Sequence, residues 1–193
     1  MQLIDFKKVK DGKYLKNYEI EYRNKSGKVK KYEIVSRSEI NSSEELGTKL
    51  SGVSIVALYE DKMLLLKEFR MAVNRKIYNL CAGMIENGET IEDVINRELH
   101  EETGLFVEEI IDVLPPSYAA VGFSDVSTQI AIVKVNGNLT DAFLSANEEI
   151  EAGFYTKDEV SKLLLTEKFS SRAQGMAYFF SKGGFDNIPN IIK

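Results

Sequence analysis

The first part of the chain alternates apolar and polar residues. Between residues 14 and 37, aromatic or aliphatic side chains alternate with charged ones, and this period of two predicts strands with one buried face. The segment from Asn24 to Gly27 interrupts the alternation and is typical of a hairpin turn. We therefore expect an antiparallel β-hairpin here, followed by a polar connection over residues 41–51.

The rest of the chain predicts short strands combined with three helices. The residues expected in strands form apolar runs bounded by polar or turn residues, at 53–59, 63–69, 77–82, 105–113 and 127–135. Residues 90–103 instead place apolar side chains three and four positions apart, which is the spacing of a helix, and residues 157–165 and 172–182 also have a helical pattern. Strands and helices in this irregular order predict an α+β fold or an α/β/α sandwich.

Particular residues mark the ends of the central helix. Thr90 is a suitable N-cap, and Asp93 three residues later can complete a capping box. Gly104 can adopt the left-handed conformation that ends a helix. We expect the helix to lie between these residues, directly after a loop over residues 83–88 that has a glycine at each end.

Composition limits the partners and the metal chemistry. Of 193 residues, 25 are Lys or Arg and 30 are Asp or Glu, and the resulting net charge of −5 argues against non-specific binding to nucleic acid or to an anionic membrane. One Cys and one His exclude a disulfide within the chain and the usual zinc site of nitrogen and sulfur ligands. Any metal would bind oxygen ligands, which favours Mg²⁺, Mn²⁺ or Ca²⁺. The first residues show no apolar segment of signal-peptide type and no run suits a membrane span, so we expect a cytoplasmic protein.

Three glutamates of the central helix carry the candidate chemistry. Glu98, Glu101 and Glu102 are spaced i, i+3 and i+4, so their side chains are neighbours. They lie within or at the edge of the arc that the apolar residues of the helix occupy, where burying like charges is costly unless a cation compensates. One interpretation is a divalent metal site suited to phosphoryl transfer or pyrophosphate hydrolysis. The alternative is a solvated acidic face of the helix.

Residues 83–105 resemble a known motif, the Nudix box G-x5-E-x7-R-E-U-x-E-E-x-G-U, in which U is an aliphatic residue. Every fixed position matches, and the matching residues are Gly83, Glu89, Arg97, Glu98, Leu99, Glu101, Glu102, Gly104 and Leu105. The resemblance implies a Nudix hydrolase with an α/β/α sandwich and a mixed central sheet. Residues 51–193 would form the hydrolase domain, and residues 1–50 an N-terminal β extension that is exchanged within a homodimer.

The resemblance also assigns roles to individual residues. It implies that Glu98, Glu101 and Glu102 bind Mg²⁺ or Mn²⁺, with the backbone carbonyl of Ala82 as a further ligand. Arg97 corresponds to the catalytic-site arginine that orients these carboxylates through charge-assisted hydrogen bonds. The remaining positions support the site from the loop and the flanking turns: Glu89, Gly83 and Gly104.

The segments before the box resemble ADP-ribose pyrophosphatases in particular. The sequence Lys-Glu-Phe-Arg at residues 67–70 is similar to their Q-[YF]-R and implies that Arg70 contacts a phosphate or ribose of the substrate. The sequence Asn-Leu-Cys-Ala-Gly at residues 79–83 is similar to their E-[LM]-P-A-G. Here Asn79 stands where that pattern has an acid, and Cys81 stands in place of the proline.

A later segment resembles the loop that carries the general base in these enzymes. It begins with Glu148, Glu149, Ile150 and Glu151, and the base would be Glu148 or Glu149, although a solvated loop is an alternative interpretation. The resemblance implies metal-dependent hydrolysis of ADP-ribose to AMP and ribose 5-phosphate.

Other functions stay open at this point. The substrate could be another nucleoside diphosphate sugar or a nucleoside triphosphate, and a non-catalytic nucleotide-sensing module is a further alternative. In each case the partner is a small nucleotide, not a nucleic acid or a membrane. Two other residues have ordinary interpretations: we expect Cys81 to be a small packed residue and His100 to face solvent.

Overall fold

The structure is a computed structural model that describes residues 1–186. The chain forms two compact units, each of which combines two segments. The first unit comprises residues 1–51 and 116–128, and the second comprises residues 52–115 and those from 129 onward. Each unit has its own hydrophobic core, and they are described in turn.

The first unit contains a three-stranded antiparallel sheet in the order β1-β2-β3, formed by β1 (Gln2–Asp11), β2 (Lys16–Arg23) and β3 (Val29–Ser36). The expected hairpin is β2 and β3, and the side-chain oxygen of Asn24 accepts hydrogen bonds from backbone amides within its turn. One face of the sheet buries Tyr18, Ile20 and Ile34. Strand β1 was not expected, because its sequence is rich in lysine and its exposed positions do not alternate clearly.

The second segment of this unit adds the short strand β9 (Ser117–Tyr118), which pairs with the start of β10 (Ser127–Asn136). The amide of Val35 in β3 donates a hydrogen bond to the carbonyl of Phe123, so the segment is joined to the three-stranded sheet. A short 3-10 helix, η1 (Ser43–Glu45), precedes the chain's entry into the second unit.

The second unit is built on a mixed sheet with the strand order β11-β5-β4-β10-β8. Its strands are β4 (Leu50–Tyr59), β5 (Lys62–Arg70), β8 (Phe106–Val113), β10 and β11 (Ile150–Tyr155). Two shorter strands extend it: β6 (Arg75–Asn79) pairs with β5, and β7 (Cys81–Met84) pairs with β4. The turn between β5 and β6 contains the 3-10 helix η2 (Met71–Val73).

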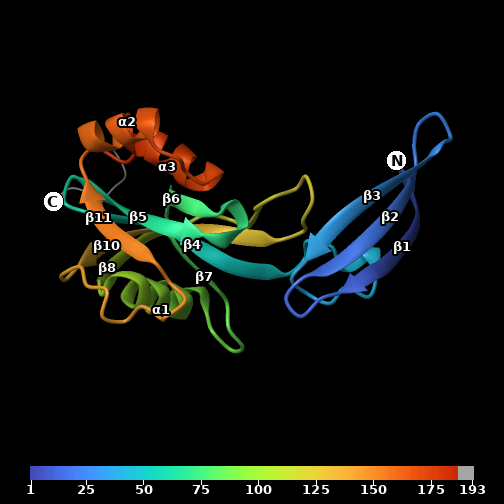
Figure 1. Ribbon diagram of the computed structural model, residues 1–193, viewed down its shortest axis with the longest axis horizontal. Helices are drawn as coiled ribbons and strands as arrows, with labels where there is room; N and C mark the ends of the chain where they lie inside the picture. Colours follow the sequence, from blue (N-terminus) through green and yellow to red (C-terminus); the bar gives the residue numbers. More distant parts are fainter. Residues whose placement is uncertain (187–193) are drawn as a thin grey trace. The chain divides into compact units, whose positions relative to one another are not determined.

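Helices cover both faces of this sheet, as Figure 1 shows. Helix α1 (Ile91–Thr103) lies on one face, and α2 (Lys157–Thr166) and α3 (Ser171–Ser181) lie on the other. Alternate residues of β5 divide between two cores: Leu64 and Leu66 pack with α1, and Met63 and Leu65 pack with α2 and α3. A strand buried on both faces has a continuous apolar sequence, which explains the run at 63–66. The predicted α+β class and α/β/α sandwich are therefore confirmed.

The ends of α1 agree with the sequence prediction. The hydroxyl of Thr90 accepts a hydrogen bond from the amide of Asp93 at 3.2 Å, and the Asp93 carboxylate accepts one from the amide of Thr90 at 2.9 Å. Gly104 ends the helix with φ of 76°, a left-handed conformation that glycine adopts without strain. These contacts fix where α1, the helix of the Nudix box and hereafter the box helix, begins and ends.

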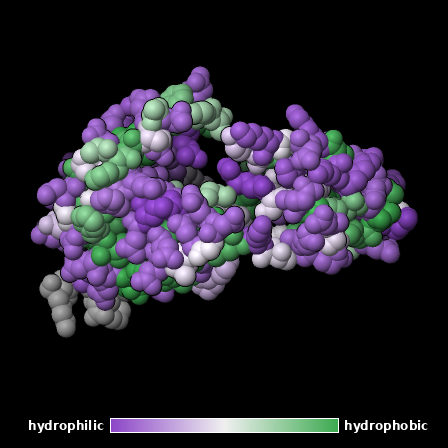
Figure 2. All heavy atoms as spheres, turned by 90° about the horizontal axis from the view of Figure 1, so that it is seen from below, coloured by the Kyte–Doolittle hydropathy of each residue, from purple (hydrophilic) through white to green (hydrophobic). Residues whose placement is uncertain are grey.

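The surface is mainly polar. On the face drawn in Figure 2, hydrophilic residues predominate and hydrophobic ones are scattered among them. Within residues 1–186, no helix is both long and apolar enough to cross a membrane.

Candidate active site

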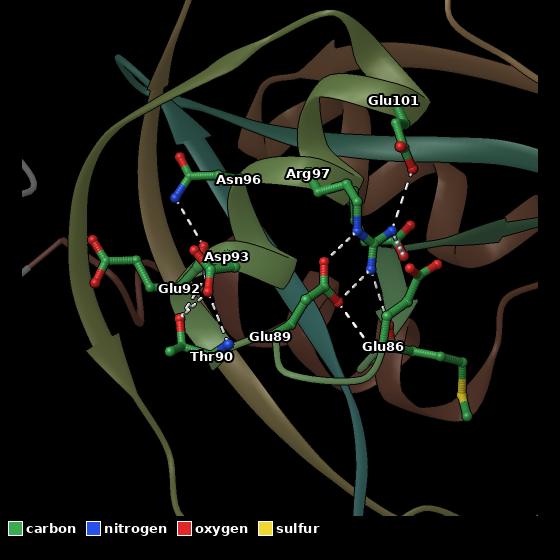
Figure 3. Close-up of polar contacts among 10 residues, drawn as sticks. Glu86, Glu89, Thr90, Glu92, Asp93, Asn96, Arg97 and Glu101 are labelled. Atoms are coloured by element: carbon green, nitrogen blue, oxygen red, sulfur yellow. Dashed lines mark hydrogen bonds and ion pairs between the residues drawn. The ribbon is translucent and has the colours of Figure 1, made fainter.

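Arg97 lies in the middle of α1 and is the centre of an ion-pair cluster (Figure 3). Its Nε and Nη2 atoms donate to the two carboxylate oxygens of Glu89 at 2.7 and 2.9 Å. Its Nη1 donates to Glu98 at 2.6 Å and to Glu101 at 3.3 Å, and Nη2 also donates to the carbonyl of Met84 at 3.0 Å. One guanidinium therefore connects the loop before α1 with two of the helix glutamates.

The cluster changes the protonation behaviour of its members. The Arg97 guanidinium lowers the pKa of Glu89 to about 2, and a hydrogen bond from the amide of Glu86 at 2.8 Å acts in the same direction. The carboxylates of Glu89 and Glu98 raise the pKa of Arg97, which stays protonated at any ordinary pH. Glu89 is thus charged near neutral pH, and its contacts with Arg97 and with the amide of Glu86 join the loop to the helix.

Glu98 packs directly against the backbone of β7. A Cβ atom built at Gly83 would lie 1.9 Å from the carboxyl carbon of Glu98, so any larger residue would displace this side chain. Burial raises the pKa of Glu98 against the lowering effect of Arg97, and the charges of Glu101 and Glu148 add to the rise. The glycine at the first box position thus leaves the space in which the Glu98 carboxylate lies.

Glu102 is partly buried beside β7, as Glu98 is, whereas Glu101 is exposed. One of its oxygens accepts a hydrogen bond from the amide of Ala82 at 3.2 Å. Burial raises the pKa of Glu102 to about 8, and the nearby charges of Glu98 and Glu68 act in the same direction. This carboxylate therefore lacks a cation to compensate its charge among the described residues.

A pocket of about 290 Å³ opens beside Glu102. It is lined by Glu68, Phe69, Arg70, Met71, Ala72, Glu102, Asn147, Glu148, Glu149 and Ile150. The sheet thus brings residues from β5, the box helix and the loop before β11 into one cavity. Three of the residues expected at the site outside the helix, namely Arg70, Glu148 and Glu149, share this pocket with Glu102.

Two neighbouring glutamates of the loop differ in their partners. Glu149 forms an ion pair with Lys76 at 2.9 Å, and Lys76 also pairs with Glu151 at 2.5 Å. The side chain of Glu148 accepts a hydrogen bond from the amide of Ser145 at 2.8 Å and lies close enough to Glu98 to raise the pKa of that residue. Only Glu148 of the two is thus electrostatically linked to the box helix.

The side chains fit a hard divalent cation, although they are not gathered around one point. Across residues 1–186, no three Asp, Glu, His or Cys side chains are close enough together to form a ready-made metal site. Glu98 and Glu101 contact Arg97, whereas Glu102 contacts Ala82. The donors are carboxylate oxygens, two of them have pKa values raised by burial, and such a set favours a cation like Mg²⁺ or Mn²⁺.

The structure adds site residues that the sequence analysis did not select. Glu68 is only 7% exposed and lines the same pocket. Its signal in the sequence is the alternation along β5, in which the positions that face α1 change from Leu64 and Leu66 to Glu68 and Arg70. Charged residues that continue a buried apolar alternation indicate a functional cavity.

Cys81 lies where the sequence analysis expected it, whereas His100 does not. Cys81 is buried, and burial raises the pKa of its thiol well above the usual value, so it is a packed residue as expected. His100 does not project freely into solvent. Its ring lies between those of Phe106 and Phe143, with centroid distances of 4.9 and 4.3 Å.

Comparisons with known proteins agree with this geometry. The model of the NUDIX domain matches residues 48–179. An ADP-sugar pyrophosphatase of Mus musculus is 28% identical over 135 residues, which are 67% of this chain and 59% of that protein. An ADP-ribose pyrophosphatase of Saccharomyces cerevisiae is 29% identical over 139 residues, which are 70% of this chain and 58% of that protein. The chain thus spans less than two thirds of the length of these two relatives.

A solved structure has the same fold. It is a crystal structure described as an ADP compounds hydrolase, with a TM-score of 0.72, 18% identity, and coverage of 98% of this chain and 96% of that chain. At this identity the likeness concerns the fold alone.

Proposed function

Because the chain belongs to the NUDIX domain family, we propose that it is a divalent-metal-dependent pyrophosphohydrolase acting on ADP-ribose or a closely related nucleoside diphosphate sugar. The observation that carries the proposal is the pocket in which Arg70 and Glu148 meet Glu102 of an intact Nudix box. The named activities of the mouse and yeast relatives support ADP-ribose-type substrates.

In this proposal the box glutamates hold the metal. Glu98 and Glu102, with Glu101 and the carbonyl of Ala82, would bind Mg²⁺ or Mn²⁺. When bound, a divalent ion neutralises the diphosphate and acidifies water. Arg97 keeps Glu98 and Glu101 oriented, and it limits the repulsion between them.

The pocket residues would act on the substrate. Arg70 binds a phosphate oxygen through its guanidinium, for which a planar fork of donors is well suited. Glu148 takes the proton from the attacking water, whose oxygen forms a new bond to phosphorus while the bridging P–O bond breaks. Glu148 is preferred to Glu149 as this base, because the ion pair with Lys76 occupies Glu149. With ADP-ribose, the products are AMP and ribose 5-phosphate.

The N-terminal part is included in the proposal. Residues 1–50 would act as a β extension that two copies exchange in a homodimer, and residues 51–193 would form the hydrolase domain. Light scattering on the purified chain tests the dimer, and deletion of residues 1–50 should convert it to a monomer.

The experiment that tests the function measures product release over a panel of nucleotides. ADP-ribose, other nucleoside diphosphate sugars and nucleoside triphosphates are incubated with the enzyme and either Mg²⁺ or Mn²⁺, and a phosphatase then releases phosphate from the products. We expect turnover to be highest on ADP-ribose and to stop when EDTA is added. Preference for a triphosphate would overturn the substrate class, and binding of ADP-ribose without any turnover would favour a sensing module.

A further inference from the structure

Glu68 accepts hydrogen bonds from two different donors inside the pocket. One of its oxygens lies 3.2 Å from Nη1 of Arg70, and the other lies 2.5 Å from the side-chain nitrogen of Asn79. Pairing of β5 with β6 explains the second contact. Leu66 is opposite Asn79 and Glu68 is opposite Ile77, so Glu68 and Asn79 are diagonal neighbours on one face.

Ser170 fixes which way the amide of Asn79 points. The Ser170 hydroxyl caps α3 by accepting a hydrogen bond from the amide of Ala173 at 3.3 Å, and its proton is therefore free to be donated. The side-chain oxygen of Asn79 accepts that proton at 2.6 Å. Asn79 consequently turns its NH₂ group towards Glu68. The guanidinium of Arg70 has donors and no acceptor, so both partners of Glu68 are donors. An ionised carboxylate can accept a hydrogen bond at each of its two oxygens, and it therefore suits this position.

We propose that Glu68 and Asn79 form a matched acceptor–donor pair that positions Arg70 for the diphosphate of the substrate. Arg70 has a long side chain that is 55% exposed, and without a fixed partner it would lose conformational freedom when it binds substrate. An ion pair with the nearly buried Glu68 orders the guanidinium in advance, because Glu68 is itself held by Asn79. Both are positioning residues, and this inference rests on the proposed function of Arg70.

Both positions of the pair depart from the ADP-ribose pyrophosphatase pattern that these segments resemble. That pattern has glutamine where this chain has Glu68, and an acid where it has Asn79. A glutamine that accepts from Arg70 through its oxygen would turn its NH₂ group towards position 79, where an acid could accept from it. In this chain acceptor and donor are exchanged, and the hydrogen bond runs in the opposite direction.

The exchange makes a definite prediction for variants. Glu68→Gln alone leaves an NH₂ group facing either Asn79 or Arg70, both of which are donors. Asn79→Asp alone replaces a donor that lies 2.5 Å from Glu68 with a carboxylate, so two negatively charged acceptors face each other. The double variant Glu68→Gln/Asn79→Asp restores one donor and one acceptor, and Ser170 can donate to the new carboxylate as it does to Asn79.

The experiment compares the wild type with the two single variants and the double variant, by kcat and KM for ADP-ribose and by Tm. We expect Glu68→Gln to raise KM about tenfold with kcat nearly unchanged, as loss of one charge-assisted hydrogen bond predicts. Asn79→Asp should raise KM at least as much, and the double variant should return to within about threefold of the wild type. In an Arg70→Ala background, Glu68→Gln should have no further effect on KM, because Glu68 acts through Arg70.

Other outcomes overturn the proposal. If the effects of the single variants add in the double variant, the two residues are not a matched pair. If Tm falls in the single variants and recovers in the double variant while KM stays at the wild-type value in all three, the pair is structural only. Tighter substrate binding by Glu68→Gln would mean that its charge merely repels the diphosphate.

A measurement without substrate separates this inference from the proposed function. The ¹⁵N–¹H resonances of the Arg70 guanidinium, assigned by comparison with Arg70→Lys, report whether this side chain is ordered. They should be sharp in the wild type, broadened in Glu68→Gln and sharp again in the double variant; unchanged resonances would overturn the pairing. If the resonances behave as expected but the nucleotide panel shows no ADP-ribose turnover, the function of the chain is wrong and the pairing stands.

Discussion

The carboxylates around α1 form two groups that differ in how their negative charge is compensated. The arginine cluster consists of Glu89, Glu98 and Glu101 around Arg97, and its cation comes from the chain itself. The second group lines the pocket and consists of Glu68, Glu102, Glu148 and Glu149, of which Glu149 forms an ion pair with Lys76. Of these, Glu102 is partly buried and accepts a hydrogen bond from a backbone amide, with no ion pair to it among the described residues.

This difference in compensation predicts different roles for the two groups. A group of carboxylates that is compensated by an internal arginine is stable without a ligand and holds the loop on the helix. A buried carboxylate without an internal cation costs free energy until a ligand supplies the charge. The comparison therefore predicts that substitution of Glu102 or Glu148 changes turnover, and that substitution of Arg97 or Glu89 changes stability first. Glu98 and Glu101 belong to both groups, because they pair with Arg97 and are also proposed metal ligands.

The largest effect is expected from Glu102→Gln. Since loss of a residue that merely supports a metal ligand costs about 10- to 100-fold, loss of a ligand should lower kcat more than about 100-fold. Because burial disfavours the charged form of Glu102, Tm measured in EDTA should be unchanged or higher. Steady-state kinetics and thermal unfolding check both points. Glu92→Gln, at an exposed position of the same helix, is the matched control and should leave both values unchanged. Wild-type turnover by Glu102→Gln would remove this residue from the site.

The next comparison concerns the two adjacent loop glutamates. Glu148→Gln should lower kcat by about 100-fold, the lower end of what a general base contributes. Glu149→Gln loses an exposed ion pair with Lys76 and should stay within about threefold of the wild type, because such pairs contribute little. Pre-steady-state or steady-state rates with saturating metal distinguish the two. An equal loss in both variants, or a larger loss in Glu149→Gln, would contradict the assignment of the base.

A smaller effect, mainly on stability, is expected in the arginine cluster. Arg97→Ala leaves Glu89 and Glu98 without their partner and should lower the free energy of unfolding by about 2 kcal/mol, as hydrogen bonds to charged groups predict. Arg97→Lys keeps the charge but loses the fork of donors, and should recover part of this loss. Urea unfolding without metal measures both variants. A variant with wild-type stability and no activity would show that Arg97 acts on the chemistry directly.

The smallest effect is a dependence on pH. The folded-state pKa of Glu89 is about 2, below its ordinary value of 4.5, so its contribution to stability is present above pH 4.5 and is lost as pH falls towards 2. The stability difference between the wild type and Glu89→Gln should therefore be constant near neutral pH and should shrink below about pH 4.5. Chemical unfolding at a series of pH values measures it. A difference that does not depend on pH would show that the Arg97–Glu89 pair is not what Glu89 contributes.

Local sequence predicted the elements well where local contacts define them. The limits of α1 follow from a capping box and a left-handed glycine, all within one helix turn of the ends. Strands β4, β5 and β10 followed from apolar runs that are buried on both faces. The single run expected at 77–82 instead divides into β6 and β7, and β11 was not among the predicted strands. Strand β1 could not be predicted, because its charged sequence becomes a strand only through pairing with β2.

The sequence by itself determined the box: three glutamates of α1, the arginine among them and the glycine that admits Glu98 all lie between Gly83 and Glu102. The tertiary structure decided which of those glutamates is buried, which loop glutamate is linked to the helix, and which residue holds Arg70. Glu68, Asn79 and Ser170 are far apart in the chain and meet because β5 pairs with β6 and α3 packs beside it. Hydrogen-bond direction depends on such contacts, and residue order does not reveal them until the chain is folded.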